Sequence, residues 1–275
     1  MRLLPILILS LVVSGFFPAN QAQARPKHLF KIAAMAPEGS IWITTFKEFA
    51  DEVAQKTAGE VKFRMYPGGI MGDDIAMYRK MRAGQLHGGG FTMTGIAAIV
   101  PDFRVMSIPF LFHSYEEADA IRKKITPLWH QTFNKKGMTM LAFTEIGFIY
   151  PMSTGPISTS GELQKSSNWI PAGDPLATAF LAQLEITPVP LSIPDVHSSL
   201  QTGMIDTIYN SLYGSIVMQW FHKARYITDS PFAYAYGVFL VSSKKFAKLK
   251  PEHAAIVRKT AEKHFTQLLE ATRKT

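Results

Sequence analysis

The sequence predicts an α/β protein of two lobes with a ligand cleft between them, and three observations support this fold class. Short apolar runs bounded by Gly or Pro alternate with segments whose apolar residues recur every three or four positions, the pattern of strands followed by packed helices. The chain has 275 residues, and the mature part of about 250 fits one large domain or two of moderate size. Its composition changes at 150–163 ("YPMSTGPISTSGEL"), where we expect the chain to cross between the lobes.

The amino terminus has the pattern of an export signal. A positive residue precedes the apolar run Leu3–Phe17, and positions 22–24 read A-x-A, as a signal-peptidase site requires. A membrane anchor is the alternative, but a span usually needs about 20 apolar residues, and this run is shorter and contains Pro5. We therefore expect cleavage after Ala24, which makes residues 1–24 a signal peptide and the mature chain an exported protein.

The chain contains no cysteine. This excludes disulfides, thiolate metal sites, a cysteine nucleophile and a lipid anchor on cysteine. Combined with an export signal, the composition indicates the periplasm as the location.

Strands and helices of the first half can be assigned in order. The apolar residues of segment 40–58, from Trp42 to Val53, recur at steps of three and four and so share one helical face. Ser114-x-x-Glu117 is a capping box that opens a further helix, in which Pro127 predicts a kink. We expect strands at 28–37, 61–67, 88–93 and 138–143, and helices at 40–58, 73–83 and from 114 onward.

The second half continues the alternation. Asp174 is a good N-cap residue, and Pro175 suits the first helical position after it. Later strands are expected at 206–210 and 236–242, followed by a helix at 251–275. Strands that alternate with helices predict helices packed on mostly parallel sheets.

Charge and motifs exclude several classes of function. The formal net charge is +8, but the cations are scattered and no groove-reading motif is present, so we expect no nucleic-acid partner. The eight histidines lack H-x-x-x-H or H-E-x-x-H spacing, and no G-x-S-x-G motif occurs. We therefore predict no metal, no cofactor and no catalytic residues, that is, a protein that is not an enzyme.

Several ordered segments carry a resemblance to a known family. The run 187–211, "TPVPLSIPDVHSSLQTGMIDTIYNS", resembles the periplasmic substrate-binding subunits of TRAP transporters, the DctP-like family. The supporting segments are "APEGS" at 36–40, "YPGG" at 66–69 with "MG" at 71–72, "SIPFLF" at 107–112 and "YIT" at 226–228.

The resemblance implies the periplasmic binding protein fold, in which two α/β lobes close around a small solute and a long helix braces them. It implies that the loaded protein docks on a membrane permease driven by a sodium gradient. It also implies a chain some tens of residues longer than this one. Helix 251–275 has no C-cap, so we expect a truncated carboxyl terminus.

The same resemblance identifies the ligand site and one departure from it. Trp169 stands where most family members carry an arginine that pairs with a substrate carboxylate, while Pro171 is kept. Tryptophan offers one N–H donor and an apolar face, so it cannot neutralise a carboxylate. A second family arginine is missing near Phe148–Tyr150, and the pocket segment 90–92 is uncharged.

We therefore predict a solute less polar than a dicarboxylate, such as an aromatic or branched monocarboxylate or a neutral hydrophobic metabolite. Trp169 would stack on the solute and Asn210, which matches a family asparagine, would hold one polar end; alternatively, Trp169 is turned into the core of its lobe. The predicted ligand-binding residues are Trp169, Asn210, Phe91, Thr92, Pro171, Ile193, Tyr213, Phe148 and Tyr150.

Two alternatives to transport stay open. A ligand-binding protein that presents its solute to a membrane sensory receptor would have the same fold, and adjacent genes for membrane permease subunits would separate the two. An exported hydrolase lacks a nucleophile and base in the sequence. For the lobes, we expect residues 25–150 with about 229–250 in lobe I, 151–228 in lobe II, and 251–275 in the carboxyl-terminal helix.

Overall fold

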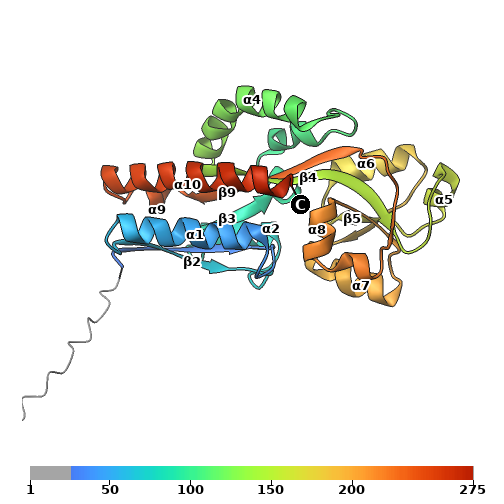
Figure 1. Cartoon of the computed structure of the whole chain (residues 1–275), viewed down its shortest axis with the longest axis horizontal. Coiled ribbons are helices and arrows are strands. Elements are labelled where there is room, and N and C mark those ends of the chain that lie inside the picture. Colours follow the sequence, from blue (N-terminus) through green and yellow to red (C-terminus); the bar gives the residue numbers. More distant parts are fainter. Residues whose placement is uncertain (1–25, 275) are drawn as a thin grey trace, which may run out of the picture.

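Two bodies joined by long strands make up the protein, which we describe from a computed structural model over residues 26–274. The predicted signal peptide, residues 1–24, lies outside these described residues. Figure 1 shows one body with long helices packed beside strands and a smaller body of short helices and strands. The strand β4 (Met138–Ser153) extends from the first body into the second. We refer to the larger body as lobe I and to the smaller one as lobe II.

Lobe I contains most of the main sheet and the long helices. The order of strands in this sheet is β2-β1-β3-β9-β4-β7, with β8 also paired to β4. Besides the first part of β4, the elements of lobe I are β1 (His28–Ala34), α1 (Ile41–Lys56), β2 (Val61–Tyr66), α2 (Asp74–Arg82), β3 (Gly88–Thr92), α3 (Met93–Ala97), the 3₁₀ segment η1 (Pro101–Ser107), α4 (Tyr115–Lys135), β9 (Ala233–Ser242), α9 (Ser243–Phe246) and α10 (Pro251–Thr272).

Lobe II is built on the end of β4 and on shorter elements. A two-stranded parallel sheet, β5-β6, lies apart from the main sheet. The elements of lobe II are α5 (Ser160–Gln164), β5 (Trp169–Pro171), α6 (Pro175–Gln183), β6 (Val189–Leu191), η2 (Ile193–Asp195), α7 (Val196–Thr202), β7 (Thr207–Asn210), α8 (Leu212–Val217), η3 (Trp220–His222) and β8 (Tyr226–Ile227).

The predicted helix starts at Ser114 and Asp174 are confirmed. The capping box expected at Ser114 is only half formed, because the Glu117 side chain accepts from the backbone N–H of His113 and not of Ser114. The side chain of Ser114 accepts a hydrogen bond from the backbone N–H of Glu117 at the start of α4. The side chain of Asp174 accepts one from the backbone N–H of Ala177, and Pro175 is the first residue of α6. Each cap satisfies a backbone donor that has no partner within its helix.

The prediction of mostly parallel sheets is wrong for the described strands. Three strand pairings are parallel, β1 with β2, β1 with β3 and β5 with β6. Four pairings are antiparallel, and all of these involve β4 or β9. The reason is that β4 continues through the predicted crossing and β9 returns beside it in the opposite direction, so the connection between lobes is itself a pair of sheet strands.

Two apolar cores cover the two faces of the lobe I sheet. One packs α1 and α10 against β1, β2 and β9, around Phe49 and Phe239. The other packs η1 and α4 against β9 and β4, around Phe103 and Trp129. The predicted face of α1, from Trp42 to Val53, belongs to the first of these cores. The sheet of lobe I is therefore buried on both faces.

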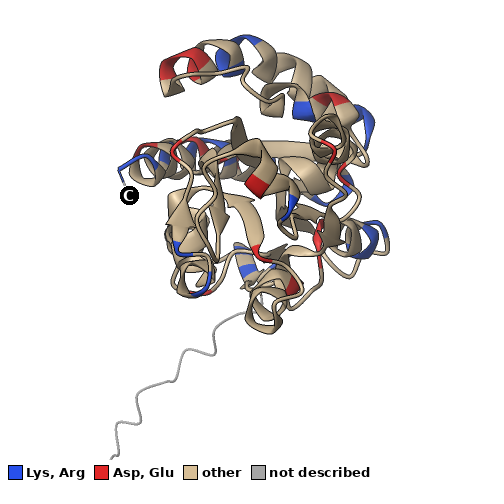
Figure 2. Ribbon diagram, turned by 90° about the vertical axis from the view of Figure 1, so that its right-hand side faces the viewer, with Lys and Arg blue, Asp and Glu red and all other residues tan. Residues whose placement is uncertain are grey.

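Among the described residues, none of the helices has the length and apolar character needed to cross a membrane. Figure 2 shows basic and acidic segments interspersed over the helices on the side it presents.

Candidate functional site

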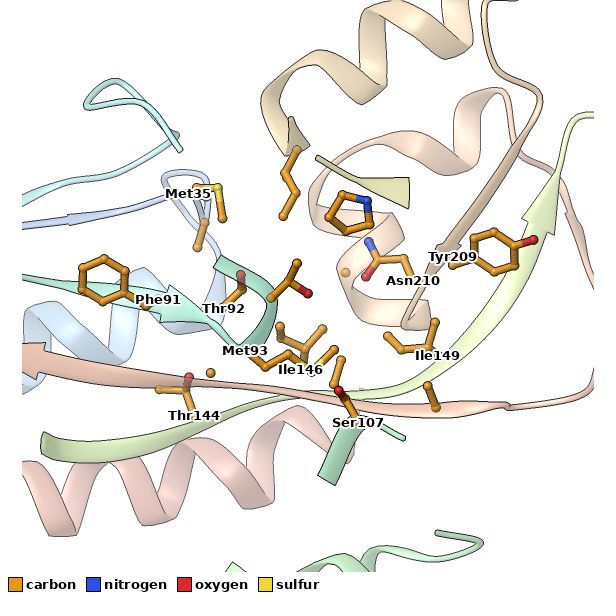
Figure 3. A pocket seen from close by; sticks show the side chains of 18 of the residues that line it. Met35, Phe91, Thr92, Met93, Ser107, Thr144, Ile146, Ile149, Tyr209 and Asn210 are labelled. Carbon is orange, nitrogen blue, oxygen red and sulfur yellow. The ribbon is translucent and has the colours of Figure 1, made fainter. Parts of the chain in front are cut away.

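A cavity of about 260 Å³ lies between the lobes. It is lined from lobe I by β3, α3, η1 and β4 and from lobe II by β5, α6, β7 and α8. Figure 3 shows side chains from both lobes around this space, with Met93 and Ile146 on one side and Asn210 on the other. Cavities between domains are the usual place for a small ligand.

The walls of the cavity are mainly apolar. Among the described lining residues, only Arg104 and Asp174 carry a charged side chain. The larger apolar side chains in the lining include Met93, Ile146, Ile149, Leu176, Phe180 and Phe232. Such a lining favours a solute that has apolar surface to bury.

Of the residues predicted from the sequence, six line the cavity: Phe91, Thr92, Trp169, Pro171, Ile193 and Asn210. The side chain of Asn210 lies at the end of β7, and Figure 3 shows it directed into the space. Its Oδ1 accepts a hydrogen bond from the backbone N–H of Ser211 at 2.9 Å. Its Nδ2 group has no hydrogen-bond partner among the described residues, so this amide has donors available to a solute.

Gly214 on α8 makes room for this amide. A Cβ added at Gly214 would lie 2.5 Å from Oδ1 of Asn210. Real Cβ atoms do not approach an oxygen so closely, so only glycine at this position allows Asn210 its observed orientation.

Trp169 forms part of the wall, but its hydrogen-bond donor is already used. The side chain is only 3% exposed and packs edge-on against Trp220 at a ring distance of 5.3 Å. Its indole N–H donates to the backbone carbonyl of Leu191 at 3.1 Å, across the β5-β6 pair. The indole is thus held by the core of lobe II, as in the alternative stated above, while it borders the cavity. Whether it also contacts a solute stays a prediction.

The other three predicted residues are not in the lining of this cavity. Tyr213 reaches across to lobe I, where its hydroxyl accepts a hydrogen bond from the backbone N–H of Ile41 at 2.7 Å. Phe148 packs against Tyr115 at 4.9 Å, within lobe I. Tyr150 packs against the core of lobe II. The first of these is a contact between the lobes, and the other two are core contacts.

A buried carboxyl group supports the lobe I wall. Asp74 is 4% exposed, and its carboxyl oxygens accept hydrogen bonds from the backbone N–H of Thr92 at 3.2 Å and from the Thr92 hydroxyl at 2.5 Å. Burial raises the pKa of Asp74 to about 7. The Thr92 hydroxyl in turn accepts from the N–H of Gly95 and so caps α3.

The charged pair in the cavity was not predicted as a site. Arg104 lies in η1 of lobe I and is 9% exposed, and its Nη2 atom lies 2.6 Å from Oδ1 of Asp174 at the start of α6 in lobe II. The hydroxyl of Thr94 lies 3.4 Å from the other oxygen of Asp174. The Nε and Nη1 atoms of Arg104 are buried and have no hydrogen-bond partner among the described residues. The only signal in the sequence was a single arginine within the apolar run "PDFRVMSIPF".

Chemically, the cavity can enclose a small organic molecule and offer it N–H donors. The lining contains no histidine and no cysteine among the described residues. The hydroxyl of Ser107 donates to the backbone carbonyl of Arg104. The arrangement therefore supports binding of a small molecule.

Comparison with known proteins gives the family. Residues 32–275 match the family described as bacterial extracellular solute-binding protein, family 7, or DctP. The chain is 24% identical over 211 residues to the 2,3-diketo-L-gulonate-binding periplasmic protein YiaO of Escherichia coli, covering 75% of this chain and 63% of YiaO. It is 22% identical over 253 residues to the C4-dicarboxylate-binding protein DctB of Bacillus subtilis, covering 90% and 71% of the two chains.

Solved structures share the fold. A TRAP periplasmic solute-binding protein of Sulfitobacter sp. NAS-14.1 with bound β-D-galacturonate superposes with a TM-score of 0.83 at 20% identity, covering 89% of this chain and 82% of that one. A TRAP periplasmic solute-binding protein of Desulfovibrio salexigens with bound orotic acid gives a TM-score of 0.83 at 20% identity, covering 90% and 79%.

These matches confirm the two-lobe fold predicted from the sequence and a binding protein rather than an enzyme. The chain belongs to the family described as bacterial extracellular solute-binding protein, family 7, the DctP family.

Proposed function

We propose that this protein captures a small organic acid with a largely apolar body in the periplasm and delivers it to the membrane subunits of a sodium-driven TRAP permease. The observation that carries the proposal is the cavity between the lobes, whose walls are mainly apolar and contain one cation and one anion among the described residues. Its volume of about 260 Å³ lies just below the usual range for ligand pockets, about 300–1,000 Å³, and so favours a small solute.

The family supports an acidic solute. The proteins matched above are named for, or hold, carboxylic acids: 2,3-diketo-L-gulonate, C4-dicarboxylates, galacturonate and orotic acid. The apolar walls of this cavity favour an acid with one carboxylate over a dicarboxylate, since an apolar wall cannot compensate a second buried charge. In this proposal the indole face of Trp169 and the side chain of Ile149 border the body of the solute, and Asn210 donates to one polar end.

Export is part of the proposal. Signal peptide cleavage after Ala24 would release the mature chain into the periplasm, where a soluble carrier meets both the solute and the permease.

Two measurements test the function. Native mass spectrometry of freshly purified protein should find a co-purified organic acid. Tryptophan fluorescence should then titrate with aromatic and branched monocarboxylates, and Trp169→Phe should lose part of the signal change because Trp169 borders the cavity. Trp129→Phe is the control, since Trp129 is buried in the core of lobe I and is not in the cavity lining. Tight binding of dicarboxylates with no binding of monocarboxylates would refute the proposed solute class.

A further inference from the structure

The guanidinium of Arg104 is incompletely satisfied. Arginine has five N–H donors, and in this side chain only Nη2 is paired, with Asp174. Nε and Nη1 are buried and have no partner among the described residues, although Arg104 lines the cavity. Donors that are removed from water and left unpaired are unfavourable. The site therefore has unused capacity for a hydrogen-bond acceptor beside a fixed positive charge.

The same protein contains a guanidinium, that of Arg273, whose three nitrogen atoms all donate hydrogen bonds, four bonds in total. Arg273, just after α10, donates from Nε and Nη2 to the carboxylate of Glu145 at 2.8 and 2.6 Å. It also donates from Nη1 and Nη2 to the carboxylate of Asp119, at 2.9 Å for both bonds. One guanidinium can thus hold two carboxylates at once, because its planar N–H groups point in several directions.

We propose that Arg104 is the anchor for the carboxylate of the solute. Arg104 would then hold two carboxylates, that of Asp174 and that of the solute, as Arg273 holds those of Glu145 and Asp119. This inference rests on the proposed function and assigns the recognition of the anion to a residue of η1. The solute carboxylate would accept hydrogen bonds from the free N–H groups of Arg104 while Asp174 keeps its ion pair with Nη2.

The ion pair between Arg104 and Asp174 also determines which solute charge the cavity prefers. Arg104 and Asp174 together are neutral, so the first carboxylate of a solute adds one negative charge beside a cation. A second carboxylate would meet no further cation among the described lining residues and would be repelled by Asp174. The cavity should therefore select monocarboxylates, and Asp174 acts as a selectivity residue against dianions.

Two matched series of probes separate charge from shape. The aromatic series is 3-phenylpropanoate, 3-phenylpropanamide and phenylsuccinate; the sugar series is galacturonate, galactose and galactarate. In each series the first compound is a monoanion, the second is neutral and the third is a dianion. Dissociation constants are measured by calorimetry for the wild type, Arg104→Gln, Arg104→Lys and Asp174→Asn. The control is Arg79→Gln, which removes an exposed arginine of α2 outside the cavity.

In the series that binds, we expect the wild type to prefer the monoanion. Arg104→Gln should weaken binding of the monoanion by about 100-fold, as expected for loss of a charged hydrogen-bond partner. The affinity for the neutral analogue should stay within about threefold of the wild-type value. Arg104→Lys should recover part of the lost affinity. Asp174→Asn keeps a good N-cap for α6 and should reduce the discrimination against the dianion by about tenfold. Arg79→Gln should bind as the wild type does.

The outcomes are distinguishable. If the wild type yields no co-purified acid and binds neither series, the proposed function is overturned. If it binds the monoanion and both Arg104 variants, folded by circular dichroism, bind it equally well, the anchor is overturned while the function stands. Equal discrimination against the dianion in Asp174→Asn and wild type would overturn the selectivity role of Asp174.

Discussion

Asp74 should make the stability of this protein depend on pH in an unusual direction. A carboxyl group that is ionised in the unfolded chain normally stabilises a folded protein when it is paired. Among the described residues, Asp74 has no cation beside it and accepts only the two hydrogen bonds from Thr92, while burial raises its pKa from 3.8 to about 7. Folding therefore favours the protonated form of this group, and the carboxyl is a local cost to stability at neutral pH.

The sign and size of the effect follow from proton linkage. Below pH 3.8 the group is protonated in both states and has no effect. Between pH 3.8 and about 7 the unfolded chain loses the proton first, so stability falls as the pH rises, by up to about 1.4 kcal/mol per pH unit. Above pH 7 the loss levels off at on the order of 4 kcal/mol. Asp74→Asn removes the ionisation and should abolish this dependence.

The assay is urea unfolding of the wild type and Asp74→Asn at pH 5 and pH 8. The difference in free energy of unfolding between the two proteins should grow in favour of the variant by roughly 2–3 kcal/mol between these pH values. Asp51→Asn, which removes an exposed carboxylate on α1, should change stability by less than about 0.5 kcal/mol at both. A difference between Asp74→Asn and wild type that is the same at pH 5 and pH 8 would refute the reasoning.

Three further predictions concern contacts at the cavity and between elements. Gly214→Ala places a methyl group against Asn210, so solute affinity should fall by roughly tenfold in calorimetry with little change in the unfolding midpoint. Tyr213→Phe removes the acceptor for the amide at the start of α1; hydrogen exchange at that amide should accelerate, and stability should fall by about 1 kcal/mol. Arg273→Met leaves Glu145, whose side chain is fully buried, without its cation; urea unfolding should show a loss of roughly 3–5 kcal/mol, and a loss below about 1 kcal/mol would contradict this assignment.

The sequence predicted local structure well because the signals were local. Helix starts at Ser114 and Asp174 rest on side chains that cap their own backbone, so a few residues decide them. The direction of β9 relative to β4 rests on the path of the whole chain, which no short window contains. Mostly parallel pairing was therefore expected, and the structure has antiparallel pairs wherever β4 and β9 take part.

The candidate site was predictable only where it lies on segments that the family shares. Asn210, Thr92 and Pro171 were placed at the cavity by resemblance, and the structure has them in its lining. Phe148 and Tyr150 flank the lining residue Ile149 on β4 but have other contacts, because successive side chains on a strand point to opposite faces. Tyr213 lies on the helix α8, and its hydroxyl contacts lobe I instead of the cavity.

The cation of the cavity does not stand at the position where the resemblance to the family places an arginine. Trp169 fills that position and is buried against Trp220. Arg104 comes from a 3₁₀ segment 65 positions earlier and meets Asp174 only because the two lobes face each other across the cavity. A charge that depends on a contact between lobes has no signature in either segment alone, since each is an ordinary turn or helix start. The loss of an expected arginine from one strand therefore does not make a cleft neutral, and the charge of this cavity has to be counted over both of its walls.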